Sequence, residues 1–221
     1  MTDTQFEDRN GNVVIGRPVS TDSLKILFNA RRCRLIIEAG VILENCTIHF
    51  DGDDGEIFIG RNSEYRGSMR LGIAGRISIG HTLYATGNCF ISALEAQTVT
   101  IGNDCLFGSS VDIRTDDAHP IFDRSSGERI NKSSSVEIGN HVWLAAHVAV
   151  GRGAVVGEGS VIGYRSYVRA AIPAHCIAVG SPAKVTREDI VWDRAHLSMH
   201  IKTIVDHLDE LDHPVWTPTP F

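Results

Sequence analysis

The 221-residue sequence lacks several features that would place it in other protein classes. It has no run of about 18 apolar residues, so we expect no membrane-spanning helix. It has no excess of basic residues, and its net charge of −6 argues against a nucleic-acid-binding surface. The polar start, MTDTQFEDRN, does not resemble a secretory signal. A hydrophobic content of 43% and a charged content of 22% are typical of a soluble globular domain.

Cysteine is present but not in a pattern that indicates a disulfide framework or a metal site. The five cysteines show no CxxC spacing, and their number is odd. Cys105 lies where a small inward residue is expected, which predicts a buried thiol that packs as a small apolar group. These observations favour a reducing compartment, and we expect a cytoplasmic protein. The cysteines are Cys33, Cys46, Cys89, Cys105 and Cys176.

A repeat of six residues dominates the C-terminal half of the chain. Large aliphatic residues recur without a gap at Ile138, Leu144, Val150, Val156, Ile162 and Val168. Glycine or alanine directly follows five of them, and a small or β-branched residue comes four positions later. A period of six fits neither an amphipathic helix nor one long strand. It predicts short strands joined by tight corners and wound into an all-β solenoid.

A looser form of the repeat extends upstream and is interrupted at one corner. Ile37, Leu43 and His49 are six residues apart, and the aromatic Phe107 fills a position that is usually aliphatic. The longest interruption is the polar segment 114–135, which lacks any period and contains proline and glycine. Interruptions at one corner of a solenoid form a local protrusion, where repeat proteins often place function. A long loop in a compact domain is more often functional than idle.

The pattern divides the chain into three parts. Residues 1–34 are expected to form a strand-rich N-terminal cap, and residues 35–186 the solenoid with its inserted loop 114–135. Residues 187–221 are expected to form a C-terminal α-helix and tail, because apolar residues follow a helical period over 187–211. The residues expected on one face of that helix include Ile190, Arg194, Leu197 and Ile201.

Three segments resemble a known family, the hexapeptide-repeat acyltransferases. They are VEIGNHVWLAAHVAVGRGAVVGEGSVIGYRSYV at 136–168, the AVGSPAKV that follows, and DDAHPIFDRSSGERIN at 116–131. The last is similar to the loop of bacterial carbohydrate O-acetyltransferases that modify capsule, lipopolysaccharide or polysialic acid. The resemblance implies a left-handed parallel β-helix and a homotrimer. It also implies acetyl-CoA bound between two prisms and a carbohydrate acceptor.

His119, within DDAHP, is the candidate general base. A neutral imidazole can take a proton from a sugar hydroxyl at neutral pH, but a loop histidine can equally cap a turn before Pro120. The residues alone leave these interpretations about even, and the resemblance favours catalysis. Asp116, Asp117 and Asp123 are the candidates for orienting the imidazole and for binding the acceptor.

Trp143 is the second candidate catalytic residue. The register of the repeat turns both of its neighbours, Val142 and Leu144, toward the core. The side chain of Trp143 should therefore point out of the prism, where a tryptophan needs a partner or a ligand. The resemblance places this position beside the thioester, where the indole N–H can bind the oxyanion. A contact between subunits explains an outward tryptophan almost as well, and the two interpretations are compatible.

The remaining candidates concern the acyl donor. Ala145 and Gly163 are small residues that could let acetyl-CoA approach backbone N–H groups, although corner geometry alone also explains them. Arg165, Lys184 and Arg187, together with Arg152, are expected to form a basic group near the coenzyme phosphates, although for each one solubility is also a sufficient explanation.

Three alternative functions remain open at this point. N-acetylation of an amino sugar or nucleotide-sugar fits the same fold, and so does a non-catalytic trimer. A carbonic-anhydrase-like zinc site would require three histidine-type ligands in one place. His141 and His147 occupy the same position in successive hexads and so fall on different faces. We therefore expect no metal.

Overall fold

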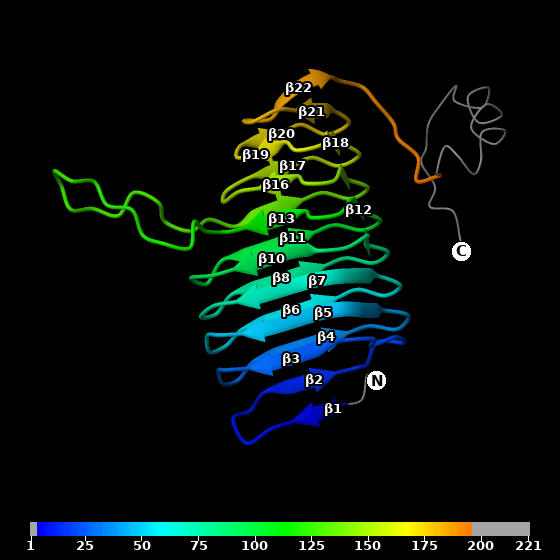
Figure 1. Ribbon diagram of the computed structural model, residues 1–221, viewed down its shortest axis with the longest axis vertical. Coiled ribbons are helices and arrows are strands. Elements are labelled where there is room, and N and C mark those ends of the chain that lie inside the picture. Colours follow the sequence, from blue (N-terminus) through cyan, green and yellow to red (C-terminus); the bar gives the residue numbers. More distant parts are fainter. Residues whose placement is uncertain (1–3, 196–221) are drawn as a thin grey trace.

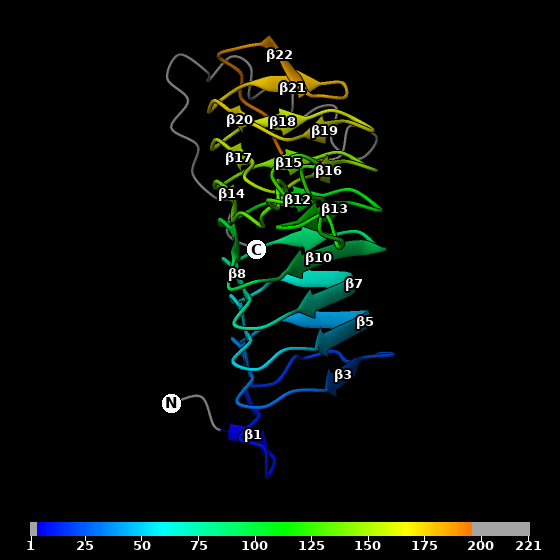
Figure 2. The same ribbon diagram turned by 90° about the vertical axis from the view of Figure 1, so that its left-hand side faces the viewer.

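The six-residue repeat forms short strands that stack in register from one coil to the next. The computed structural model describes residues 4–195 and shows a parallel β-solenoid with three faces (Figures 1 and 2). Strands separated by one coil pair in parallel, for example Ile138 with Val156 and Leu144 with Ile162. The predicted solenoid is confirmed, and the strands of residues 1–34 join the same sheets.

The first face is one continuous sheet, and its strands alternate in sequence with those of the other two faces. Its strands are β1 (Thr4–Glu7), β2 (Val13–Ile15), β4 (Arg34–Ile37), β6 (Glu56–Ile59), β8 (Arg76–Ile79), β11 (Thr98–Ile101), β14 (Val136–Ile138), β17 (Val155–Val156) and β20 (Ala171–Ile172). All of these pairs are parallel except β1 with β2, which is antiparallel at the N-terminal end.

The second and third faces share a sheet because two long strands, β5 (Ile42–Phe50) and β7 (Glu64–Leu71), bend from one to the other. The second face then contains β9 (Tyr84–Ala85), β12 (Leu106–Phe107), β15 (Trp143–Leu144), β18 (Val161–Ile162), β21 (Ile177–Val179) and β22 (Lys184–Arg187). The third face contains β3 (Lys25–Phe28), β10 (Cys89–Ala93), β13 (Asp112–Arg114), β16 (Ala149–Val150) and β19 (Tyr167–Val168).

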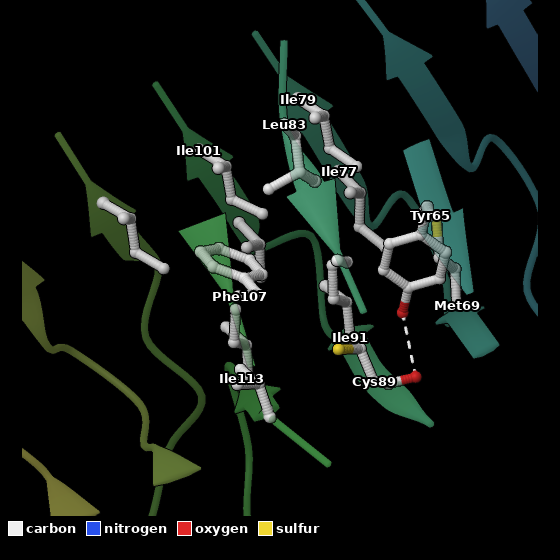
Figure 3. Packing of buried hydrophobic residues seen from close by; sticks show 14 of the residues in the cluster. Tyr65, Met69, Ile77, Ile79, Leu83, Cys89, Ile91, Ile101, Phe107 and Ile113 are labelled. Carbon is white, nitrogen blue, oxygen red and sulfur yellow. Dashed lines mark hydrogen bonds between the residues drawn. The ribbon is translucent and has the colours of Figure 1, made fainter. Parts of the chain in front are cut away.

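One apolar core runs along the inside of the prism. Each coil contributes inward aliphatic residues, and Phe107 and Tyr65 fill the middle of the stack with no exposed surface (Figure 3). The hydroxyl of buried Tyr65 donates to the carbonyl oxygens of Ser68 and Cys89 at 2.9 and 3.0 Å, so its polar atom is satisfied. Cys105 is fully buried as predicted, and burial raises the pKa of its thiol to about 12.

The register differs from the sequence expectation in β5. We expected His49 in the inward series, whereas Ile48 and Phe50 are the buried residues. A bulge between Leu43 and Cys46, with Asn45 at a φ of 46°, moves the following residues by one position. Because side chains alternate across a strand, a shift of one residue turns the opposite set inward.

The expected C-terminal helix is wrong over the residues that the structure describes. After β22 the chain descends along the outside of the prism, and residues 188–195 contain no helix (Figure 1). Contacts with the solenoid replace local helical bonds; the Ile190 N–H, for example, donates to the carbonyl oxygen of His175 at 3.0 Å. The rest of the predicted helix lies outside the described residues. Between residues 4 and 195 no helix is long and apolar enough to cross a bilayer.

Candidate active site

The segment 114–135 leaves the prism at the edge between the third and first faces and projects away from it (Figure 1). Its outer part is a hairpin in which the Ile130 N–H donates to the Ile121 carbonyl oxygen at 2.9 Å. None of its residues belongs to the core cluster, and Ile121, Phe122 and Ile130 are more than half exposed. The loop must therefore be held by polar contacts at its base.

The backbone around His119 is fixed, and its ring is left available. The side chain of Asn131, only 2% exposed, donates to the His119 carbonyl oxygen at 2.8 Å and accepts from the Ile121 N–H at 2.6 Å. It thus clamps the chain on both sides of Pro120. The imidazole is exposed and has no hydrogen-bond partner among residues 4–195. An imidazole on a fixed backbone that is open to solvent can serve as a general base.

The three aspartates hold the loop and make no contact with the imidazole. Asp116 is buried and accepts from the Ala118 N–H at 2.8 Å. Asp117 accepts from Asn131 at 3.1 Å and from Arg152 at 3.0 Å. Asp123 caps a turn through Ser125 and Ser126, and these hydrogen bonds lower its pKa to about 2.

A second fastening joins the loop to a smaller insertion in the repeat, SALEAQT at 92–98, which follows the preceding coil at the same corner. Glu95 accepts hydrogen bonds from the Arg129 guanidinium and the Ser133 hydroxyl. These contacts lower the pKa of Glu95 to about 2, with the Arg129 hydrogen bond as the main cause. The two insertions therefore stack at one corner, as their positions in the repeat predicted. Neither Asn131 nor Glu95 was identified from the sequence, because their partners are distant or are backbone atoms.

Trp143 points out of the second face, as predicted, and 38% of it is exposed. Its backbone N–H donates to the Ser160 carbonyl oxygen at 2.9 Å, which fixes the strand. Its indole N–H has no acceptor among the described residues and is available to a ligand. Its neighbours in the outward column are also apolar: Tyr84, Leu106, Val161 and Ile177.

His119 and Trp143 are not brought together within one chain. The loop that carries His119 begins after β13 and ends before β14, at the edge between the third and first faces. Trp143 lies in β15 on the second face, and Figure 1 shows the loop and the paired strand β12 on opposite sides of the prism. A site that uses both side chains would therefore need two copies of the protein.

The backbone N–H groups of Ala145 and Gly163 already have partners within the prism. Their backbone N–H groups donate to the carbonyl oxygens of Ile162 and Ala178, each at 2.9 Å, and so cannot bind a ligand as well. A Cβ at position 163 would lie 2.6 Å from Val179 Cγ1, so packing between coils explains this glycine. Both residues can still border a ligand.

The expected basic group is only partly assembled. Arg165, Lys184 and Arg187 are exposed on the last coils of the prism, and the Arg165 guanidinium lies 5.2 Å from the Tyr164 ring centre. Arg152 does not belong with them, because it pairs with Asp117 at the base of the loop. Arg165, Lys184 and Arg187 have no carboxylate partner among residues 4–195 and remain candidates for binding coenzyme phosphates.

The sequence interpretation missed a buried polar cluster beside Trp143. It consists of Asp104 and His141 from one edge of the prism and Trp192 and Arg194 from the descending segment. Reasoning from the repeat treated His141 only as a corner residue and placed Trp192 in a helix. Residues 4–195 contain no group of three or more histidine, cysteine, aspartate or glutamate side chains suited to a metal ion.

Comparison with known proteins places this geometry among acetyltransferases. The chain is 37% identical over 136 residues to a polysialic acid O-acetyltransferase of Escherichia coli O1:K1, an alignment that covers 62% of this chain and 44% of that protein. It is 32% identical over 182 residues to a putative lipopolysaccharide biosynthesis O-acetyl transferase of Escherichia coli K12, covering 75% of this chain and 92% of that protein. No family model matches.

Solved structures agree with the sequence relatives. The crystal structure of NeuO, a polySia-specific acetyltransferase, superposes with a TM-score of 0.67 at 34% identity, covering 91% of this chain and 94% of that one. The polysialic acid O-acetyltransferase OatWY gives a TM-score of 0.69 at 26% identity, covering 89% and 95%. In sequence, the chain spans about half the length of the two polysialic acid O-acetyltransferases it matches, 44% of one and 55% of the other.

Proposed function

Because this chain belongs to the hexapeptide-repeat acyltransferases, we propose that it is an acetyl-CoA-dependent O-acetyltransferase acting on a carbohydrate hydroxyl. The acceptor would be a surface polysaccharide or its precursor, the class of molecule that the relatives' names describe. The observation that carries the proposal is the imidazole of His119, held out to solvent on a backbone that Asn131 clamps on both sides.

The working unit would be a homotrimer with acetyl-CoA between neighbouring prisms. An outward column of apolar side chains on a solenoid face favours contact with another copy, since such a patch is costly to leave in water. Trp143 lies in that column, and His119 lies at a different edge of its own chain. Association about a three-fold axis would let the loop of one copy reach the Trp143 face of the next.

The reaction is a direct transfer that needs one base and one oxyanion donor. His119 takes the proton of the acceptor hydroxyl, and the oxygen attacks the carbonyl carbon of the acetyl thioester. The indole N–H of Trp143 binds the tetrahedral oxyanion. When the C–S bond breaks, the imidazolium returns the proton to the thiolate. The cationic side chains of Arg165, Lys184 and Arg187 would bind the coenzyme phosphates.

We propose that Asn131 supports His119 in place of an orienting aspartate. No described carboxylate of the same chain contacts the imidazole. Instead, a side-chain amide fixes the backbone on both sides of Pro120. We further propose that the protein is cytoplasmic, because its five cysteines are free and buried, which suits a reducing compartment.

The test is turnover of acetyl-CoA with carbohydrate acceptors. Replacing His119 by alanine should lower kcat by about 10²–10⁴-fold, the usual contribution of a general base, and leave the affinity for CoA unchanged. Arg124→Ala is the matched control, because Arg124 is exposed in the same loop. Near-wild-type turnover by His119→Ala would refute the assignment.

The other classes of function give different results in the same assay. An N-acetyltransferase would prefer amino sugars to their hydroxyl analogues. A non-catalytic trimer would show no rise in melting temperature with acetyl-CoA, because a ligand that binds the native state must stabilise it. A carbonic-anhydrase-like enzyme would contain stoichiometric zinc after purification.

A further inference from the structure

The segment of residues 188–195, here called the strap, lies against the outside of the prism and packs on residues of the candidate donor site. It follows β22 and descends along the edge between the first and second faces (Figure 1). Trp192, in the strap, is 8% exposed although it is not part of the core cluster. Its burial comes from contacts on the outer surface of the prism.

The stacked pair of His141 and Trp192 is one of the contacts that hold the strap on the prism. The rings of His141 and Trp192 stack with centres 4.1 Å apart and planes 9° apart. The Trp192 indole N–H donates to the His141 carbonyl oxygen at 2.9 Å, and His141 Nε2 lies 3.0 Å from the Trp192 carbonyl oxygen. Each residue thus binds the backbone of the other, which fixes the position and the tilt of the Trp192 ring.

Both ring nitrogens of His141 have close polar neighbours. Nδ1 lies 2.6 Å from a carboxylate oxygen of Asp104, and Nε2 lies 3.0 Å from the Trp192 carbonyl oxygen. Arg194 is the other charged group here; its guanidinium lies 2.9 Å from the second Asp104 oxygen. Asp104, His141 and Trp192 are buried, whereas the side chain of Arg194 is 24% exposed.

Trp143 lies directly beside this assembly. Its ring centre is 5.8 Å from that of Trp192, with the planes at 44°. Of the two indoles, Trp192 has its N–H occupied by the His141 carbonyl oxygen, whereas that of Trp143 has no acceptor among residues 4–195. Trp192 therefore limits the orientations that the Trp143 ring can adopt, while leaving its donor available.

We propose that Trp192, fixed by His141 and Asp104, is a positioning residue that sets the orientation of Trp143, so that the strap forms one wall of the acyl-donor site. The inference rests on the proposed function, in which the Trp143 N–H binds the oxyanion. An oxyanion donor contributes only when it is aimed at the oxyanion position, and a misplacement of about 1 Å can cost about 10²-fold in rate.

The test is a double-mutant cycle on kcat with Trp143→Phe and Trp192→Ala. Trp192→Ala alone should lower kcat by about 10- to 100-fold, and Trp192→Phe, which keeps the ring but loses the indole N–H, by less. In the Trp143→Phe background, Trp192→Ala should change kcat by less than about threefold, since the donor to be oriented is already gone. Val191→Ala is the control, because Val191 is an exposed neighbour in the strap.

The cycle separates the inference from the function on which it rests. Equal fold-losses from Trp192→Ala in both backgrounds would overturn the positioning role, and so would a Trp143→Phe variant with wild-type kcat. His119→Ala is assayed in parallel. If this variant kept wild-type turnover, the proposed base would be refuted whatever the result of the cycle. If Trp192→Ala does not fold, Trp192→Phe and Asp104→Asn replace it in the same cycle, and equal losses in both backgrounds again overturn the inference.

Discussion

Replacing Asn131 by alanine should release the His119 turn without unfolding the prism. The Asn131 side chain makes hydrogen bonds to the Ile121 N–H at 2.6 Å, the His119 carbonyl oxygen at 2.8 Å and the Asp117 carboxylate at 3.1 Å. Each is worth about 1 kcal/mol net, and its partners are exposed enough to be hydrated once freed. The closed loop should therefore lose about 2–3 kcal/mol relative to its opened form.

This loss of loop stability can be measured by amide hydrogen exchange. At about 1.4 kcal/mol per factor of ten, exchange of the Ile121 and Ile130 amide protons should accelerate by about 30- to 150-fold. The melting temperature should change little, because no residue of the loop belongs to the core cluster. We expect kcat to fall by about tenfold or more, since the base is no longer held in place.

Two further variants make this prediction specific. Asn131→Asp keeps an acceptor for the Ile121 N–H but loses the donor and adds a negative charge beside Asp117, so it should be at least as damaging as alanine. Lys132→Ala, at the exposed neighbouring position, should behave as wild type. Wild-type exchange rates together with wild-type kcat in Asn131→Ala would refute the role assigned to the clamp.

Three other predictions concern the fastening of the loop and the core. The pKa of Glu95, about 2 in the folded protein and below its ordinary 4.5, means that its contacts stabilise the loop above about pH 4.5 and weaken as pH falls toward 2. Amide exchange in residues 121–130, corrected for intrinsic rates, should therefore be constant from pH 8 to 5, and an acceleration already at pH 6 would be inconsistent with this. Gly67→Ala should lower the free energy of unfolding by about 2–5 kcal/mol, because φ is +137° and a Cβ would lie 1.9 Å from the Cys89 carbonyl oxygen. Gly87→Ala is the control, since a Cβ there meets nothing within 4 Å. Equal melting temperatures of the two variants would contradict this prediction. Tyr65→Phe should cost about 1–3 kcal/mol by leaving the buried Ser68 and Cys89 carbonyl oxygens without this donor, and an unchanged denaturation midpoint would argue against it.

The repeat determines which side chains face the core, and this much could be predicted. Inward aliphatic residues at six-residue spacing placed Leu144 inside and Trp143 outside, and both are confirmed. The prediction failed for His49, where a bulge after Leu43 changes the register. A bulge depends on one residue in a left-handed conformation, here Asn45, and the hydrophobic pattern does not show that.

His119 and Trp143 could be predicted as candidates from the chemistry of their side chains. The residues around them could not, because those contacts join segments that are distant in the sequence. Asn131 acts on the backbone at positions 119 and 121, which no motif reveals. Trp192 fitted neither the six-residue repeat nor the apolar series of the expected helix, and a large aromatic outside both patterns was the available signal that it packs elsewhere. In this segment, stacking and hydrogen bonding of Trp192 with His141 determine the structure, and the helical period of the sequence does not.

The central claim is that His119 of one copy and Trp143 of another form one site. Mixing His119→Ala and Trp143→Phe subunits, each of low activity alone, tests it directly. After equal mixing and reassembly, about one quarter of sites should combine an intact His119 with an intact Trp143 from different copies, so activity should return toward about one quarter of the wild-type value. No recovery in a mixture whose subunits are shown to have exchanged would contradict the account.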